Sequence, residues 1–326
     1  MRQNYLSKDN SLAVRGIMAI AIWVIHLQAM VPSMKASLIG RVFPHLAYIM
    51  VAIFFFFSGY GCMVSFLRKG DHYIETFWHD RVLNLYLKYI IAGAITLTAS
   101  FIFWDPFSFR NIMNMLLLID PNMLGGWYIQ ALLIMYGLWY IGVKYFYHHT
   151  CGYSIVAILL YLIIVSMPIF WFELFIQSAV GFPLGCFWAA HKNEIDKFCL
   201  VKKNYIWLLI LSGLLFVATW GLGNIHFLSS SLEIFIKIFS SLFGVLFTLL
   251  LLMIFNFSNG FTNFLGRISF NIYIMQGLFF YLFHCKLINV DNPFLYSFLT
   301  LLSTLIFSYL LSSIYQRLDK CLIRKG

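Results

Sequence analysis

The first apolar segment of the chain carries an arginine and a histidine eleven residues apart, Arg15 and His26. If this segment is a helix, eleven residues at about 100° each return His26 to the face of Arg15, and the two lie roughly 16 Å apart along the axis. A desolvated imidazole is favoured in its neutral form and can accept a proton from a hydroxyl. A guanidinium suits the geometry of a phosphate. One helix face would therefore offer an anion anchor and a deeper base, a separation that fits an extended thioester cofactor with a phosphorylated head and a long thin arm.

Both residues also have ordinary structural explanations. An arginine at the end of a spanning helix often extends its charge toward water, and a single histidine within a span is often a hydrogen-bonded packing residue. Ionisable residues inside a bilayer are costly, however, and a functional site is the default hypothesis for them. The pair is therefore a catalytic hypothesis that needs further context.

The composition indicates a membrane protein. Of the 326 residues, 62% are hydrophobic and only 10% are charged, whereas a soluble domain has about 25% charged residues. A spanning helix needs about 20 mostly apolar residues. We predict an all-α, polytopic bundle of about ten transmembrane helices that forms a single domain over residues 1–326, with no soluble domain. The ten predicted spans are residues 12–31, 45–67, 83–103, 127–147, 152–170, 172–190, 205–222, 234–256, 264–284 and 294–315.

The basic residues predict the orientation of these helices. The net charge is +10, but with the N-terminus inside the cell most Lys and Arg residues fall on the cytoplasmic side, as the positive-inside rule requires. Both termini are then cytoplasmic, and the excess charge meets anionic lipid headgroups rather than nucleic acid. The expected location is the cytoplasmic (inner) membrane of the cell. The six cysteines show no metal-binding spacing, so we expect neither a metal site nor a disulfide framework. Five basic residues remain on the outer side: Lys35, Arg41, Arg110, Lys237 and Lys286.

Five sequence segments together resemble the membrane acyltransferase-3 family of bacterial integral-membrane O-acyltransferases. The Arg15-x10-His26 spacing resembles the signature of the first helix in that family. The resemblance extends over nearly the whole chain. Four further segments follow in the order expected for the family: Phe54-Phe55-Phe56-Phe57-Ser58-Gly59-Tyr60, Arg81-Val82-Leu83-Asn84-Leu85-Tyr86, Gly126-Trp127-Tyr128-Ile129 and Gly266-Arg267-Ile268-Ser269-Phe270-Asn271-Ile272-Tyr273.

The resemblance implies an activity and roles for some residues. It implies acyl-coenzyme A as donor, with acetyl-coenzyme A the expected form, His26 as the essential base and Arg15 as a donor-binding residue. The motif Arg81–Tyr86 also implies Arg81 as a second donor-binding residue. The implied acceptor is a hydroxyl of a cell-surface or exported glycan, or of a lipid-linked sugar.

The sequence departs from the family pattern at two positions. Asn84 stands where the family often has a second arginine, which weakens any paired-arginine site for the donor phosphates. Gln276 stands where the family has a histidine. This substitution leaves His26 as the only strong base candidate within the spans. The neutral amide of Gln276 could support the oxyanion of the reaction.

Two further residues are substrate-site candidates with competing explanations. Ser58 could be an acylated nucleophile, although a Ser-Gly pair that lets helices pack closely is the stronger interpretation. Trp127 could stack on a sugar, or it could belong to the aromatic belt at the membrane interface. Asp105, Asp120 and Glu173 could bind acceptor hydroxyls, but ordinary solvated charge explains them better.

The predicted function is therefore transfer of an acyl group, with acetyl expected, from a cytoplasmic donor to an acceptor hydroxyl. Direct transfer and a covalent acyl-enzyme both remain open, as does the oligomeric state. A transporter or flippase for lipid-linked sugars is the main alternative, although such proteins tend to show symmetric repeats. A membrane partner or sensor without catalytic activity is a third, and it leaves Arg15 and His26 without a purpose.

Overall fold

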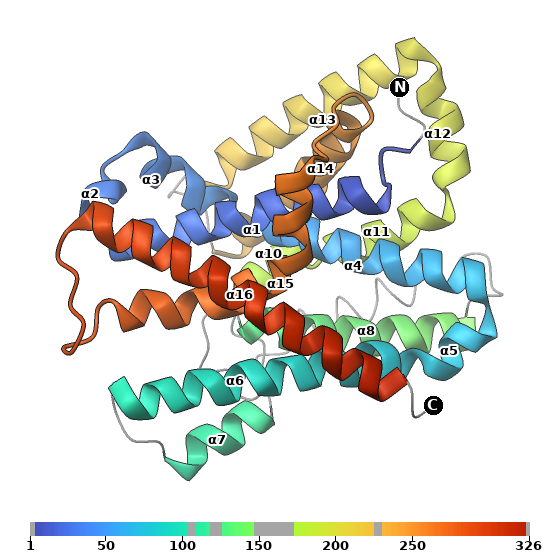
Figure 1. Ribbon diagram of the computed structural model, residues 1–326. Coiled ribbons are helices and arrows are strands. Elements are labelled where there is room, and N and C mark those ends of the chain that lie inside the picture. Colours follow the sequence, from blue (N-terminus) through green and yellow to red (C-terminus); the bar gives the residue numbers. More distant parts are fainter. Residues whose placement is uncertain (1–3, 104–107, 118–125, 147–172, 225–229, 324–326) are drawn as a thin grey trace. The chain divides into compact units, whose positions relative to one another are not determined.

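The computed structural model describes residues 4–103, 108–117, 126–146, 173–224 and 230–323 (Figure 1). All regular elements within these ranges are helices, as expected where backbone polar groups must be satisfied within each segment. This confirms the prediction of an all-α polytopic membrane protein. Seven helical stretches in the described ranges are long and apolar enough to cross a membrane: Lys8–Met30, Gly40–Lys69, Asp71–Phe103, Gly126–Tyr145, Lys202–Leu222, Ser231–Leu252 and Pro293–Arg317.

Three of the ten predicted spans fall outside these seven. The span predicted at residues 152–170 lies outside the described residues, as do Asp105 and Asp120. The span at 172–190 is instead two short helices, α10 (Glu173–Ser178) and α11 (Gly181–Ala190). Pro183 lies in the first turn of α11, where its missing N–H leaves no helical bond unmade. The third, at 264–284, is helix α15 (Gly260–Leu282), which has the length but a more polar sequence. The number ten and the cytoplasmic termini stay predictions.

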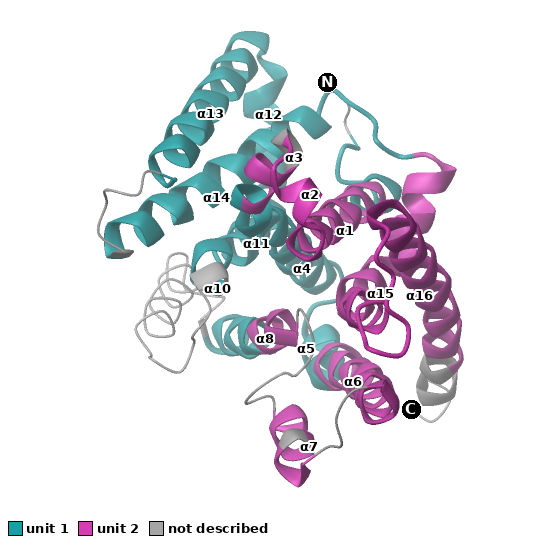
Figure 2. Cartoon of the chain, turned by 90° about the vertical axis from the view of Figure 1, so that its left-hand side faces the viewer, with its two compact units in different colours: residues 1–11, 45–78, 134–258 teal, residues 12–44, 79–133, 259–326 magenta. Residues whose placement is uncertain are grey.

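The chain divides into two compact units, each assembled from distant parts of the sequence (Figure 2). Unit 1 comprises residues Met1–Ser11, His45–Trp78 and Ile134–Ser258, and unit 2 comprises Leu12–Pro44, His79–Leu133 and Asn259–Gly326. The prediction of one domain is not tested by this division and stays a prediction.

Unit 1 is built around helix α4. Its other elements are α5, α10 to α14 and most of α8; the bounds not yet given are α4 (Ala47–Lys69), α5 (Asp71–Phe77), α8 (Gly126–Phe146), α12 (Lys192–Leu200), α13 (Lys202–Leu222) and α14 (Ser230–Leu252). Helices α4 and α11 cross so closely that a Cβ atom on Gly185 would lie 2.2 Å from the carbonyl oxygen of Phe56. The hydroxyl of Tyr5 donates to a carboxylate oxygen of Asp196 on α12 (2.9 Å), and its oxygen accepts from the Trp188 indole N–H on α11 (2.8 Å). Burial of the Tyr5 side chain raises the pKa of its hydroxyl.

Unit 2 contains α15 and the helices that surround it. Its elements are most of α1, the start of α8, and α2, α3, α6, α7, α15 and α16; the bounds not yet given are α1 (Lys8–Met30), α2 (Pro32–Lys35), α3 (Leu38–Val42), α6 (Asn84–Phe103), α7 (Phe109–Leu116) and α16 (Pro293–Ile323). Helix α7 has eight residues, so it is too short to span a membrane.

Helix α15 is the central element of unit 2. It starts with a capping box, in which Asn259 Oδ1 accepts from the Thr262 backbone N–H and Thr262 Oγ1 accepts from that of Asn259. Each residue from Asn271 to Phe280 is buried, and the helix packs against α6 and α16. Because this stretch is buried on every side, its polar side chains Asn271 and Gln276 face protein rather than lipid, as expected of polar groups that form a site.

Candidate functional site

Helix α1 is continuous from Lys8 to Met30 and carries both Arg15 and His26. The shared face predicted for the two residues therefore follows from the helix geometry, with roughly 16 Å between them along the axis. Both side chains are half-buried. No hydrogen bond or ion pair to the His26 ring occurs within the described part of the chain, so no protein group there holds its imidazole nitrogens.

Two glycines bring α1 and α15 into close contact. A Cβ atom on Gly16 would lie 2.6 Å from the backbone nitrogen of Gly266, 2.7 Å from the carbonyl oxygen of Thr262 and 2.8 Å from the Cβ of Leu265. On the other side, a Cβ on Gly266 would lie 2.1 Å from the carbonyl oxygen of Leu12. The backbones can meet here only because both positions lack a side chain. Arg15 therefore directly precedes the point where α1 crosses α15.

Further along α1, a hydrophobic cluster fixes the turn that carries His26. The Trp23 ring stacks on Phe280 of α15, with ring centroids 5.8 Å apart and 26° between the planes. The cluster combines Trp23, Leu27 and Val31 of α1 with Phe280 of α15 and Tyr296 of α16. The hydroxyl of Tyr296 donates to the carbonyl oxygen of Phe280 (2.8 Å). His26 lies about 60° around the helix from Trp23. The neighbouring residues Trp23 and Leu27 pack in the cluster, while the His26 ring lies to the side of it.

Gln276 of α15 is fully buried on the side of the helix that faces α1. At about 100° per residue, it lies within about 40° of both Thr262 and Phe280, which contact α1. Its Nε2 donates to the carbonyl oxygen of Tyr273 (3.0 Å), while its Oε1 has no partner among the described residues. The bond to a carbonyl oxygen fixes which end of the amide is nitrogen. The atom left unbonded is thus an acceptor, whereas support of an oxyanion needs a donor.

Arg81 lies in a π-helical segment, Trp78–Leu83, which leads directly into α6. Its side chain is half-buried. Single π-helical turns occur frequently at functional sites because they re-aim side chains. Helix α6 packs against α15, and the Tyr315 hydroxyl of α16 donates to the carbonyl oxygen of Lys88 on α6 (2.7 Å). Arg81 therefore starts a helix that belongs to the same packing group as α1 and α15.

Trp127 lies half-buried in the first turn of α8. The next residue, Tyr128, contacts Tyr273 of α15 with ring centroids 5.1 Å apart. The start of α8 is thereby tied to α15. His26, Arg15, Arg81, Trp127 and Gln276 are thus all placed in unit 2, on helices that pack on α15 or contact it.

Ser58 lies elsewhere, in unit 1 on helix α4. Its hydroxyl donates to the carbonyl oxygen of Phe54 one turn earlier (3.0 Å), the usual bond of a serine within a helix. A Cβ on the adjacent Gly59 would lie 2.1 Å from the carbonyl oxygen of Phe182. This geometry favours the packing interpretation of the Ser-Gly pair over a nucleophile.

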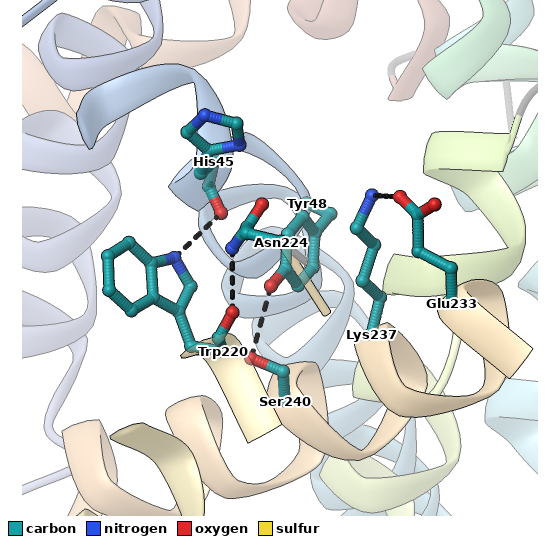
Figure 3. A network of polar contacts seen from close by, with 7 residues as sticks. All are labelled: His45, Tyr48, Trp220, Asn224, Glu233, Lys237 and Ser240. Carbon is teal, nitrogen blue, oxygen red and sulfur yellow. Dashed lines mark hydrogen bonds and ion pairs between the residues drawn. The ribbon is translucent and has the colours of Figure 1, made fainter. Parts of the chain in front are cut away.

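A second polar group, in unit 1, was not singled out by the sequence analysis (Figure 3). Lys237 and Glu233 form an ion pair on α14, with side chains 15% and 33% exposed. Nearby, Tyr48 donates to Ser240 (3.1 Å), and Figure 3 shows Tyr48 and Asn224 between Trp220 and this pair. The signal in the sequence was the i, i+4 spacing of Glu233 and Lys237. The positive-inside count included only Lys237, as one of the basic residues on the outer side.

The described residues contain no group of three His, Cys, Asp or Glu side chains placed to hold a metal ion. Unit 2 places an imidazole, two guanidiniums and a buried amide on α15 or on elements that pack against it. Such a set suits proton transfer from a hydroxyl and the binding of a phosphorylated ligand. It does not by itself name the reaction.

Comparison with known proteins names the class of reaction. No curated protein and no solved structure matches the chain significantly. Residues 12–313 match the acyltransferase-3 family, whose description is "Acyltransferase domain". The match spans both units and includes the whole Arg15–His26 segment of α1. The chain therefore belongs to the acyltransferase-3 family and is a membrane acyltransferase.

Proposed function

We propose that the protein transfers an acetyl group from cytoplasmic acetyl-coenzyme A to a hydroxyl of a cell-surface or exported glycan, in the cytoplasmic membrane of the cell. The observation that carries the proposal is the single continuous helix α1, which bears Arg15 and, eleven residues later, a half-buried His26 with no protein partner in the described residues. Family membership favours this enzyme over the transporter that the composition alone left open.

The arrangement supports a direct transfer. His26 accepts the proton of the acceptor hydroxyl while the hydroxyl oxygen attacks the thioester carbonyl. The new ester forms as the carbon–sulfur bond breaks, and the departing thiolate takes the proton from the imidazolium. Proton and leaving group are thereby balanced without a further reactant.

Arg15 and Arg81 would bind the phosphates of the donor. Guanidiniums form strong paired hydrogen bonds with phosphate oxygens. Both side chains are half-buried in unit 2, where they would bind the phosphorylated head of the donor near α1. The bond between the Ser58 hydroxyl and Phe54 supports direct transfer over an acyl-enzyme on that serine.

The test uses the purified protein with labelled acetyl-coenzyme A and membranes that carry the native surface glycan of the source cell. We expect label to appear in the glycan with the wild-type protein and not with His26→Ala. His72→Ala is the matched control, because the His72 side chain is 74% exposed and lies outside unit 2. Thermal unfolding in detergent confirms that each variant is folded. Transfer by a folded His26→Ala protein at the wild-type rate would show that His26 is not the base. A wild-type protein that transfers no label would refute the proposal.

A further inference from the structure

Two buried polar atoms on the α1–α15 seam have no hydrogen-bond partner among the described residues. They are the indole Nε1 of Trp23 and the Oε1 of Gln276, in side chains that are 5% and 0% exposed. A buried polar group without a partner costs about 1–3 kcal/mol, so each such atom calls for an explanation, such as a bound molecule that satisfies it. One of the two atoms is a donor and the other an acceptor.

Both atoms belong to the same stretch of the seam. Trp23 stacks on Phe280, and Phe280 follows Gln276 by one turn on the same side of α15, about 6 Å further along the axis. Two other buried atoms without partners in unit 2, Asn271 Oδ1 and Ser308 Oγ, lie on the different seam between α15 and α16. Asn271 is five residues before Gln276, so it points about 140° away around the helix.

The surroundings restrict what could satisfy these atoms. The neighbours of Trp23 are Leu27, Val31, Phe280 and Tyr296, and the Tyr296 hydroxyl is already bonded to a backbone carbonyl. A phosphate or carboxylate would be an anion without a cation in this cluster, and it offers only acceptors. A sugar carries many hydroxyls and would leave most of them unpaired. A thin, mostly apolar chain with a secondary amide offers one acceptor and one donor, which matches an indole N–H and an amide oxygen.

The order of residues along α1 indicates which chain this is. Arg15 comes first, Trp23 eight residues later, and His26 three residues after that. Acyl-coenzyme A has the same order of chemistry: phosphates at the head, two secondary amides in the pantetheine arm, then the thioester. We propose that Trp23 and Gln276 bind the amides of the donor's pantetheine arm, the indole N–H donating to an amide carbonyl and Gln276 Oε1 accepting from an amide N–H. This rests on the proposed function for the identity of the donor.

The test compares Trp23→Phe, which keeps the ring on Phe280 and removes only the N–H, with Gln276→Met, which keeps the length of the side chain. Each is expected to weaken coenzyme A binding, measured by calorimetry, and to raise KM for acetyl-coenzyme A by about tenfold, because each loses one buried hydrogen bond. The kcat and the KM for the acceptor should stay near the wild-type values. Two control variants each remove another buried atom without a partner: Ser308→Ala on the α15–α16 seam and Trp139→Phe in unit 1. Neither should change binding of the coenzyme.

A donor analogue tests the contact without depending on the folding of a variant. In acetyl-pantetheine whose amide N–H groups are replaced one at a time by an ester oxygen, the analogue lacking the recognised N–H should bind the wild-type protein more weakly than acetyl-pantetheine. Gln276→Met should bind the two alike, which is the coupling expected of a direct contact. Equal binding of every analogue and acetyl-pantetheine by the wild-type protein would show that Gln276 accepts from trapped water instead.

The failures of the two proposals are distinguishable. A wild-type protein that binds no coenzyme A overturns both the donor and this inference. A wild-type protein that binds and consumes acetyl-coenzyme A, together with folded Trp23→Phe and Gln276→Met proteins of unchanged KM, overturns only this inference and leaves the proposed function intact.

Discussion

Gly16 of α1 faces Gly266 of α15 so closely that a Cβ atom on Gly16 would lie 2.6 Å from the Gly266 backbone nitrogen. The contact joins the helix that carries Arg15 and His26 to the helix that carries Gln276. It also gives a physical reason for the glycine at the start of the Gly266-Arg267-Ile268-Ser269 segment. The position of the proposed base relative to the buried amide depends on this crossing.

Substitution of Gly16 by alanine should therefore destabilise the protein. The new methyl group would meet backbone atoms that cannot move aside as a flexible side chain can, and overpacking of this kind typically costs about 1–3 kcal/mol. Gly137→Ala is the control, since among the described residues no atom beyond its own helix backbone and chain neighbours lies within 4 Å of a Cβ built at this position. In an open helix the same change stabilises by up to about 1 kcal/mol. Thermal unfolding in detergent should show a lower midpoint for Gly16→Ala than for Gly137→Ala, and the reverse order would contradict the close crossing.

Arg15 should contribute to donor binding through its guanidinium geometry as well as its charge. We expect Arg15→Gln to raise KM for acetyl-coenzyme A by about tenfold or more, since a hydrogen bond to a charged group is worth about 1.5–3 kcal/mol. Arg15→Lys should give a smaller increase, because lysine keeps the charge but cannot form the paired bonds. Acetyl-pantetheine lacks the nucleotide phosphates, so its KM should hardly change.

Arg267 is the matched control for Arg15. It lies in the same unit on α15, directly after Gly266, and its side chain is exposed. Arg267→Gln should leave KM for acetyl-coenzyme A unchanged. If Arg15→Gln raised the KM for acetyl-pantetheine as much as the KM for acetyl-coenzyme A, Arg15 would not be binding the phosphates of the donor head.

Ser58 should be dispensable for acyl transfer. Its hydroxyl donates to the Phe54 carbonyl oxygen within α4, so Ser58→Ala should change stability by about 1 kcal/mol or less and retain activity. Gly59→Ala should be far more disruptive, because its Cβ would lie 2.1 Å from the Phe182 carbonyl oxygen. Unfolding midpoints and transfer rates separate the two effects. A folded Ser58→Ala protein that transfers no acetyl group would instead revive the acyl-enzyme on this serine.

Much of this arrangement could be predicted from the sequence because it depends on local spacing. The long apolar runs predict α1, α4, α6, α8, α13 and α14 to within four residues, since length and hydrophobicity alone decide a span. They also predict the start of α16, which continues eight residues past the predicted end. The face shared by Arg15 and His26 follows from helix periodicity once α1 is continuous.

The remainder depends on contacts between helices that are distant in sequence. Nothing in the segment around Trp23 indicates that its ring stacks on Phe280 while its N–H has no partner in the part of the chain that the structure describes. The bond from Gln276 Nε2 to Tyr273 decides that the free atom is an acceptor, and composition cannot show this. The run at residues 172–190 is apolar enough for one span, yet it contains the turn before α11. The motif around Ser58 suggests catalysis, whereas the contact that favours packing joins its neighbour Gly59 to Phe182, far along the chain.

The ion pair between Glu233 and Lys237 should contribute to stability through the cost of breaking it. Its side chains are 33% and 15% exposed, on a helix whose other side presents the exposed Phe235 and Phe239 rings. Glu233→Gln leaves a partly buried lysine without its partner. The loss should exceed the roughly 1 kcal/mol of an exposed pair and stay below the roughly 5 kcal/mol of a fully buried one.

Removal of both charges should restore most of that loss. The double variant Glu233→Gln/Lys237→Met should unfold close to the wild-type midpoint, because replacing both members of such a pair by uncharged residues is often nearly neutral. Glu75→Gln is the control, since the His72–Glu75 pair is about three-quarters exposed on both sides and should shift the midpoint little. If the double variant were as unstable as Glu233→Gln alone, α14 would need the charges themselves, and the cost of a partly buried, unpaired lysine would not explain the loss.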